Sequence, residues 1–238
     1  MVRRARASLP VVVAFGALLT GSGVLSLARS VGADEPKPSV PAVDPAASPE
    51  GATPLPEGAW KITFPWEPRQ SILFVSDAPV ARTVGAVNFS DSGTKPLGTI
   101  SLDGKGGGTG AFAVTVTDIS TLSPERDASL RGDKWLDAKK FPEISYAITK
   151  LEKVKPTVYR VTGTWKMHGV EREISVLADV RFVPKLQGLE APNGIARLKA
   201  KLSFSLKAFG IENPLVGSAV VADQWDAELV VLGVLAKP

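Results

Sequence analysis

Apolar and polar residues alternate in short runs along most of this chain, beginning near Trp60. In the clearest run, 195–208, every second residue from 196 to 206 is apolar, and those between are Arg, Lys or Ser. The runs 159–167 and 174–182 repeat this pattern. A period of two predicts antiparallel strands, each with one buried face and one solvated face.

The breaks between runs predict how the strands are connected. His168-Gly169 separates two alternating runs, which predicts a β-hairpin with its turn at this pair. A polar stretch near residues 124–139 is the one segment with a helix-like pattern. The Phe141-Pro142 step ends it, because a residue before proline is pushed out of the α region.

Two other segments carry turn or breaker residues. The first run, ITFPWEPRQSILF, contains Pro65 and Pro68, and proline cannot donate to a strand ladder, so we expect this strand to be irregular. The glycine-rich sequence at 104–110 lacks the Lys-Ser/Thr ending and the following helix of a phosphate-binding loop. It therefore predicts a flexible hairpin turn.

An open sheet with this alternation would expose unpaired N–H and C=O groups at its edge strands, and these groups could pair with other chains. Too few helical patterns exist to cover a sheet, whereas closure into a barrel removes the edges. We therefore predict an all-β fold: a closed antiparallel barrel of about eight strands with apolar side chains inside. The predicted interior includes several small residues, namely Gly163, Ala178, Ala196, Ala200 and Ala227. From the residues alone, a hollow barrel and a fully packed one remain equal alternatives.

The N-terminal part of the chain has a different composition. Residues 1–33 combine early arginines, an apolar stretch and a Val31-Gly32-Ala33 ending, which predicts a secretory signal peptide. An uncleaved membrane anchor is the alternative, since the apolar stretch is nearly long enough to span a bilayer. Residues 34–59 are rich in Pro and Ala and predict a disordered linker, which leaves 60–238 as the barrel domain. We expect the barrel to be exported, either to the periplasm or to the extracellular space.

Charge and composition argue against several functional classes. The chain has 28 basic and 24 acidic residues, but four basic residues and no acidic ones lie in residues 1–33. The remaining 24 basic residues balance the 24 acidic ones, so the mature protein has no global field to attract nucleic acid. With no Cys and one His, we expect no disulfide framework, no thiol nucleophile and no metal site.

The stretch from Arg126 to Phe182 also carries a combined pattern that resembles a known family. Its residues are Arg126-Asp127, Leu130-Arg131, Trp135-Leu136-Asp137, Lys140-Phe141-Pro142, Ile144, Tyr146, Val161, Gly163 and His168-Gly169-Val170, with a later Phe209-Gly210. Together they resemble the YceI-like family of small secreted, lipocalin-like barrels, over roughly residues 60–236. The resemblance implies a barrel that holds a long isoprenoid or a related amphiphilic lipid in an elongated apolar cavity. The resemblance therefore favours the hollow barrel over the fully packed one.

The inward-facing apolar residues are the candidate contacts for such a lipid. We predict that they are Ile72, Phe74, Phe112, Val114, Tyr146, Val161, Gly163, Trp165, Val176, Ala178, Ala200, Leu202, Phe204, Trp225 and Leu229. Three polar residues are candidates for headgroup contacts, namely His168, Arg126 and Arg131. Each has a structural alternative: hydrogen bonds within the turn for His168, and a local ion-pair network with Asp127 for the two arginines.

The function predicted from the sequence is that of an exported carrier or sequestering protein for a long-chain lipid, without a catalytic residue, a metal or another cofactor. One alternative is a structural or interaction barrel with a solid core. A less favoured one is a lipid-modifying enzyme that uses His168, which would require this residue to point inward beside a carboxylate or a hydroxyl. A homodimer, and a position near a membrane with the linker as a spacer, are further partner hypotheses.

Overall fold

The structure is a computed structural model that describes residues 53–89 and 95–238. The predicted signal peptide, 1–33, and most of the predicted linker, 34–59, lie outside the described residues. Within the described part of the chain, no helix has the length and the apolar character that crossing a bilayer requires.

The end of the predicted linker belongs to the folded domain, which corrects the boundary expected from the sequence. Leu55 is buried in the core, and the Thr53 carbonyl accepts a hydrogen bond from the Phe182 amide. The first strand begins at Ala59. The surrounding prolines and small residues gave no sign that Leu55 reaches the core.

Eleven strands make up one sheet in the described residues, together with one short α-helix and two single 3₁₀ turns. The strands are β1 (Ala59–Phe64), β2 (Ser71–Asp77), β3 (Arg82–Val87), β4 (Gly98–Asp103), β5 (Gly108–Thr115), β6 (Ile119–Ser120), β7 (Glu143–Lys153), β8 (Val158–Met167), β9 (Val170–Val183), β10 (Ile195–Ser205) and β11 (Gln224–Ala236). The helix is α1 (Pro124–Leu130), and the 3₁₀ turns are η1 (Val116–Asp118) and η2 (Lys207–Phe209).

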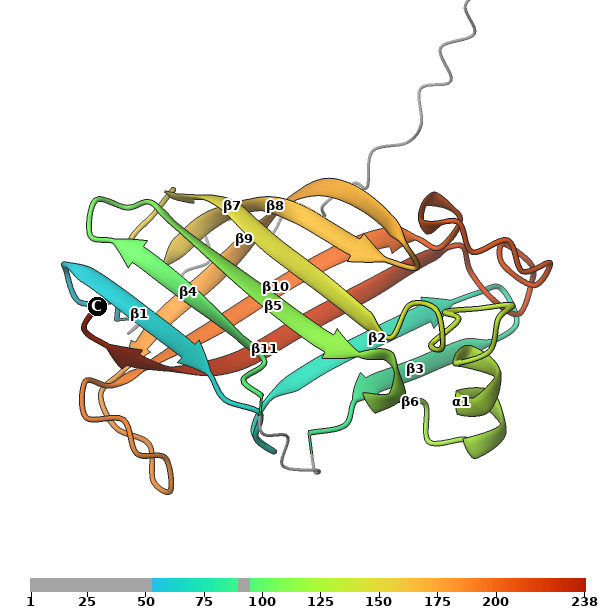
Figure 1. The fold of residues 1–238 in the computed structure, drawn as a ribbon, viewed down its shortest axis with the longest axis horizontal. Coiled ribbons are helices and arrows are strands. Elements are labelled where there is room, and N and C mark those ends of the chain that lie inside the picture. Colours follow the sequence, from blue (N-terminus) through green and yellow to red (C-terminus); the bar gives the residue numbers. More distant parts are fainter. Residues whose placement is uncertain (1–52, 90–94) are drawn as a thin grey trace, which may run out of the picture. The chain divides into compact units, whose positions relative to one another are not determined.

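Eight of the strands close into an antiparallel barrel in the order β1–β4–β5–β7–β8–β9–β10–β11, with β11 pairing back to β1 (Figure 1). The remaining strands form a ribbon, β2–β3–β6, that starts from the other half of β11. Because β6 follows β5 through η1, this ribbon continues the wall beyond the end of β1. The predicted all-β closed barrel with a short helical segment is confirmed.

The proline-containing first run is split, as its composition predicts. Residues 65–70 separate β1 from β2, and both strands pair with β11. Gln70 spans the break with its side chain: its amide nitrogen lies 2.9 Å from the carbonyl oxygens of Pro65 and Leu232. Its amide oxygen accepts from the Leu232 N–H at 2.7 Å. The side-chain amide thus replaces the ladder hydrogen bonds that an uninterrupted strand would make.

The hairpin and the helix follow the predicted positions. Met167 and Val170 pair across a two-residue turn in which His168 and Gly169 have φ values of 50° and 77°, both positive as a type I′ turn requires. Helix α1 starts from a Ser123 cap with Pro in its first turn. It ends at Leu130, and the second half of the predicted helical segment forms turns instead.

The interruption at Gln70 gives a stability prediction. We expect Gln70→Leu to lower the free energy of unfolding by about 1–3 kcal/mol, because the partly buried N–H of Leu232 loses its acceptor while the side-chain volume is nearly kept. Urea unfolding measures the change. The matched control is Gln224→Leu at an exposed position of β11, which should change stability by less than about 0.5 kcal/mol. Equal losses in the two variants would contradict the bridging role of Gln70.

Candidate functional site

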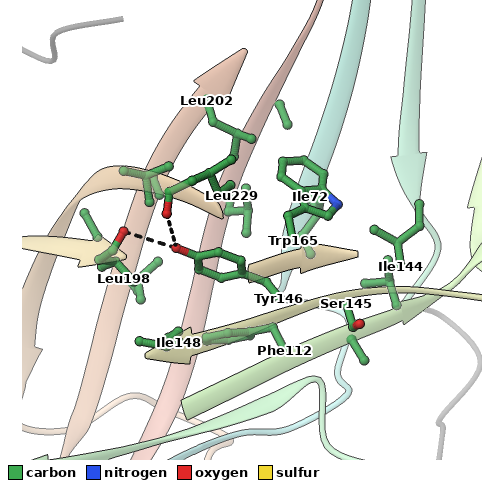
Figure 2. A pocket seen from close by; sticks show the side chains of 18 of the residues that line it. Ile72, Phe112, Ile144, Ser145, Tyr146, Ile148, Trp165, Leu198, Leu202 and Leu229 are labelled. Atoms are coloured by element: carbon green, nitrogen blue, oxygen red, sulfur yellow. Dashed lines mark hydrogen bonds between the residues drawn. The ribbon is translucent and has the colours of Figure 1, made fainter. Parts of the chain in front are cut away.

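The barrel encloses an apolar cavity of about 120 Å³ at its centre, here called the middle cavity (Figure 2). Eight strands supply its lining, which is apolar except for Ser145 and Tyr146. The predicted lipid contacts found around it are Ile72, Phe74, Phe112, Val114, Tyr146, Val161, Trp165, Val176, Ala178, Ala200, Leu202 and Leu229. The structure thus brings most of the predicted residues together, and their contact with a lipid stays a prediction.

Small residues on three adjacent strands explain why the hollow lies at this level of the barrel. Ala178 of β9 and Ala200 of β10 are register partners, and Ala227 of β11 pairs with Leu202, two residues from Ala200. All three alanines are buried and line the middle cavity. Large side chains on the opposite wall do not fill the space that these methyl groups leave, so the barrel has a void here rather than a packed core.

Two smaller apolar cavities lie on either side of the middle cavity. The proximal cavity, of about 40 Å³, shares Phe74, Ile144 and Trp165 with it, whereas the distal cavity, of about 20 Å³, shares Ile100, Val161 and Leu198. Inward residues of β8 line them in order: Tyr159 and Val161 the distal cavity, Val161 and Trp165 the middle one, Trp165 and Met167 the proximal one. The three cavities therefore follow one another along the strands.

An outer cleft of about 420 Å³ adjoins the proximal cavity beside α1. Its walls combine residues of α1, β2 and β3 with the 215–225 segment, at the end of the barrel where α1 lies next to β6 (Figure 1). Thr121, Leu130, Trp135 and Trp225 line both the cleft and the proximal cavity. Because the cleft and the proximal cavity share these four side chains, the cleft is the candidate entrance.

Tyr146 carries a hydroxyl inside the middle cavity, and the barrel wall satisfies it. The hydroxyl lies 3.1 Å from the Val161 carbonyl oxygen and 3.2 Å from that of Ile174, so its single proton is shared between them (Figure 2). Burial, and secondarily the charge of Glu173, raise the pKa of Tyr146. The phenol is therefore a neutral wall group at physiological pH, with its proton already committed to the backbone.

Trp165 forms the partition between the middle and proximal cavities. Its ring packs against Phe204 at a centroid distance of 5.0 Å and against Phe209 at 5.7 Å. Phe204 and Trp225, two more of the predicted lipid contacts, line the proximal cavity and not the middle one. A continuous channel would require this aromatic group to shift.

Gly163, another predicted lipid contact, is buried in phase with Val161 and Trp165 on β8, and its contact with a lipid stays a prediction. It lines none of the described cavities, and a Cβ at this position would clash with the Ala147 carbonyl oxygen of β7. The pairing of β7 with β8 shifts register between Ile148 and Lys150, next to this glycine. Gly163 thus permits a close approach of two strand backbones at a bulge, a role that alternation alone does not reveal.

The three headgroup candidates are not brought together at one site. Arg126 lines the outer cleft, and its guanidinium donates to the hydroxyl and carbonyl oxygens of Thr121 at 2.8 and 2.9 Å. Arg131 donates instead to the carbonyls of Thr117 and Ile119. The His168 Nδ1 lies 3.1 Å from the Phe209 carbonyl oxygen. Neither Arg131 nor His168 lines the cleft or the cavities, so both hold the chain together at this end.

Asp127 fixes α1 to the barrel wall beside the outer cleft. Its carboxylate accepts hydrogen bonds from the amide and hydroxyl of Thr121, at 2.7 and 2.6 Å, and from the Ser120 hydroxyl at 2.9 Å. Burial alone would raise the pKa of Asp127, but these hydrogen bonds and the nearby Arg131 outweigh it and lower the pKa below its usual value. The charged form therefore contributes to the stability of this end.

Among the described residues, no His, Asp, Glu, Lys or Arg lines the three cavities. The ring of His168 packs against Phe141 at a centroid distance of 4.8 Å, in the turn rather than in a cavity. Among the described residues, no group of three His, Cys, Asp or Glu is placed to hold a metal ion. What the cavities can do with their apolar lining is to bind apolar groups.

Several lining residues were not among the predicted contacts. They are Leu97, Ile100, Ala113, Ile144, Ser145, Ile148, Ile174, Leu198 and Ala227 around the middle cavity. Many of them sit at inward positions of the alternating runs, so strand periodicity was the available signal. Whether an inward residue lines the middle cavity depends on its height along the barrel axis. That height is set by the register between neighbouring strands.

Comparisons with known proteins agree with this architecture. A sequence model of the YceI-like domain matches residues 69–231. The structure of BcnA from Burkholderia cenocepacia superposes with a TM-score of 0.56 at 18% identity, covering 69% of this chain and 96% of that one. A polyisoprenoid-binding domain from Saccharophagus degradans, implicated in plant cell wall breakdown, gives a TM-score of 0.50 at 12% identity, with 74% and 98% covered. No curated protein matches the chain. At these identities, the solved structures establish the fold.

The lowered pKa of Asp127 gives a pH-dependent prediction. The stability that its charge contributes is complete above the usual Asp pKa of about 3.9 and is lost as the pH falls through the lowered pKa of the folded state. We expect Asp127→Asn to cost about 1.5–3 kcal/mol at pH 7, the scale of hydrogen bonds to a charged group, and less below pH 4. Urea unfolding of the wild type and the variant at pH 7 and at pH 3 measures this loss of stability.

The exposed Asp133 supplies the matched control, because it lies in the turn that follows α1 and its carboxylate is not buried. Asp133→Asn should change stability little at either pH. A loss in Asp127→Asn that stays the same from pH 7 to pH 3 would show that the charge of the carboxylate is not what stabilises α1.

Proposed function

The chain belongs to the YceI-like domain family, and on this basis we propose that its barrel binds a long-chain lipid of the isoprenoid type in its interior. The observation that carries the proposal is the row of three cavities with apolar walls inside a closed barrel. Water gains nothing in such a space, because it needs two to four polar partners. The solved Saccharophagus degradans domain is described as polyisoprenoid-binding, which supports the same ligand class here.

The volumes define how the barrel would accommodate such a chain. The middle cavity, at about 120 Å³, is close to the engineered cavity of about 150 Å³ in another protein that stays dry and binds benzene. Pockets for larger ligands occupy about 300–1,000 Å³. A long chain therefore binds only if the partitions at Trp165 and at Val161 shift, so that the three cavities join into one channel.

The energetics favour a carrier over a catalyst. Burial of each methylene contributes roughly 0.8 kcal/mol, and the hydrophobic effect has no preferred direction. A chain of ten or more carbons thus binds with useful affinity even after the cost of ordering it. Such a site tolerates different chain lengths and needs no reactive side chain, which fits a carrier or a sequestering protein.

The outer cleft is the proposed entrance. It adjoins the proximal cavity through Leu130, Trp135 and Trp225, and it offers the guanidinium of Arg126 at its rim. A lipid that enters tail first would leave its polar end toward this side. We further propose that the protein works outside the cytoplasm, with residues 1–33 as its export signal and the Pro-rich segment as a spacer from the membrane.

The proposal predicts that the purified full-length protein carries extractable lipid. Organic extraction followed by mass spectrometry should show isoprenoid-type lipid in a near-stoichiometric amount. Ala200→Phe, which puts a ring into the middle cavity, should lower the lipid content by at least tenfold while the protein stays folded. The volume of the cavity is comparable with that of an aromatic ring, so we expect stability to change by less than about 2 kcal/mol.

The control is the same substitution at Ala147, an exposed position of β7 that faces away from the cavities. Ala147→Phe should keep the lipid content of the wild type. Full lipid content in a folded Ala200→Phe variant would exclude the middle cavity as the binding site. An absence of lipid in every variant, together with no uptake of added isoprenoids, would instead favour a structural barrel that binds no ligand in its cavities.

A further inference from the structure

The indole N–H of Trp165 is a hydrogen-bond donor inside the barrel that has no acceptor. Trp165 is 7% exposed, and its Nε1 finds no hydrogen-bond partner among the described residues. In Figure 2 the indole nitrogen points away from the hydroxyl of Tyr146. A buried donor without an acceptor costs about 1–3 kcal/mol, so this position is unusual for a folded protein.

Two other indoles of this barrel, those of the buried Trp60 and the partly buried Trp225, are satisfied by the backbone. Trp60 donates to the Pro56 carbonyl at 2.9 Å, and Trp225 donates to the Ala222 carbonyl, also at 2.9 Å. Trp165 differs from both because it stands between the middle and proximal cavities. The unpaired N–H therefore coincides with the space that the proposed ligand would occupy.

A water molecule does not account for the missing partner. A buried water needs two to four polar contacts, and the walls around Trp165 offer few. In the proximal cavity, the Thr121 hydroxyl already donates to Asp127 and accepts from Arg126. In the middle cavity, the Tyr146 hydroxyl is already shared between two carbonyls. None of the hydroxyls that line these two cavities, those of Thr121, Ser145 and Tyr146, hydrogen-bonds to the Trp165 indole, so we take its acceptor to be part of the ligand.

The charge of that acceptor follows from the surroundings. Among the residues that the structure describes, no Lys, Arg, Asp or Glu lines the middle, proximal or distal cavity. An unpaired charged group in such an apolar enclosure is strongly disfavoured, whereas a neutral oxygen with one hydrogen bond is tolerated. The outer cleft differs in this respect, because its described lining includes the cation Arg126.

We propose that the ligand carries an uncharged oxygen, such as that of an alcohol, ketone or ether, which accepts a hydrogen bond from the Trp165 indole at the partition. This inference rests on the proposed function. The apolar chain then extends from Trp165 through the middle cavity toward the distal one, and the oxygen-bearing end lies on the side of the proximal cavity. The site thus selects an uncharged oxygenated isoprenoid over its hydrocarbon and over its phosphate ester.

The test measures by calorimetry the affinity of the delipidated full-length protein for three probes of equal chain length. The probes are farnesol, farnesene and farnesyl phosphate. Trp165→Phe removes the N–H and keeps most of the ring. We expect it to weaken farnesol by about 3- to 10-fold, the scale of one net hydrogen bond, and to leave farnesene unchanged. The matched control is Trp60→Phe, since Trp60 is buried and lines none of the described cavities. It should leave both affinities unchanged.

A second measurement does not depend on the folding of a variant. In ¹⁵N-labelled wild-type protein, farnesol should move the indole N–H signal of Trp165 downfield, and farnesene should not. Equal shifts with the two probes, or equal weakening of both in Trp165→Phe, would overturn the inference.

Farnesyl phosphate separates the remaining outcomes. Tighter binding of the phosphate than of farnesol, with no change in Trp165→Phe, would place a charged headgroup in the outer cleft and also overturn the inference. A wild-type protein that binds none of the three probes would contradict the proposed function itself. Binding of the three with equal affinity in every variant would leave the proposed function standing and remove only the role of Trp165.

Discussion

The whole barrel depends on the hydrogen-bond ladder of β11, because this strand pairs with β10 on one side and with two successive partners on the other. β2 pairs with its first half and β1 with its last residues. Buried backbone groups have to be paired, so the break between the two partners would leave a gap in the wall. Gln70 fills this gap with its side-chain amide. Closure of the wall around the apolar interior follows from this arrangement.

Once the wall is closed, the sizes of the inward side chains decide what the interior is for. Three alanines on β9, β10 and β11 leave the middle cavity, and aromatic or branched residues on either side divide the hollow into compartments. Charged side chains stay outside, where Lys199 and Lys201 pair with Glu228 across the strands. Apolar walls, a neutral phenol and one unpaired indole N–H are the features behind our proposal of an uncharged, mostly hydrocarbon ligand, and the outer cleft is its proposed entrance.

The strands and the hairpin at His168-Gly169 could be predicted because period-two alternation and turn preference are local properties of the sequence. The small inward residues Ala178 and Ala200 could be named as well, but their position opposite each other depends on the register between strands. Nothing in the sequence indicated that Gln70 bridges to Leu232, since these residues are 162 positions apart. The role of Gly163 and the unpaired indole of Trp165 have the same origin. Both depend on what a neighbouring strand places, or fails to place, next to the residue.

A single entrance at the outer cleft beside α1 would also fix the order in which the two ends of the ligand enter and leave the barrel. A lipid that enters the outer cleft with its apolar tail first dissociates with its polar end first through the same cleft. Binding and dissociation thus follow one route in opposite directions. Under the proposed carrier function, the source and the acceptor of the lipid would have to contact the same rim in turn. Any molecule bound on α1 over the cleft would block both the binding and the dissociation of the ligand.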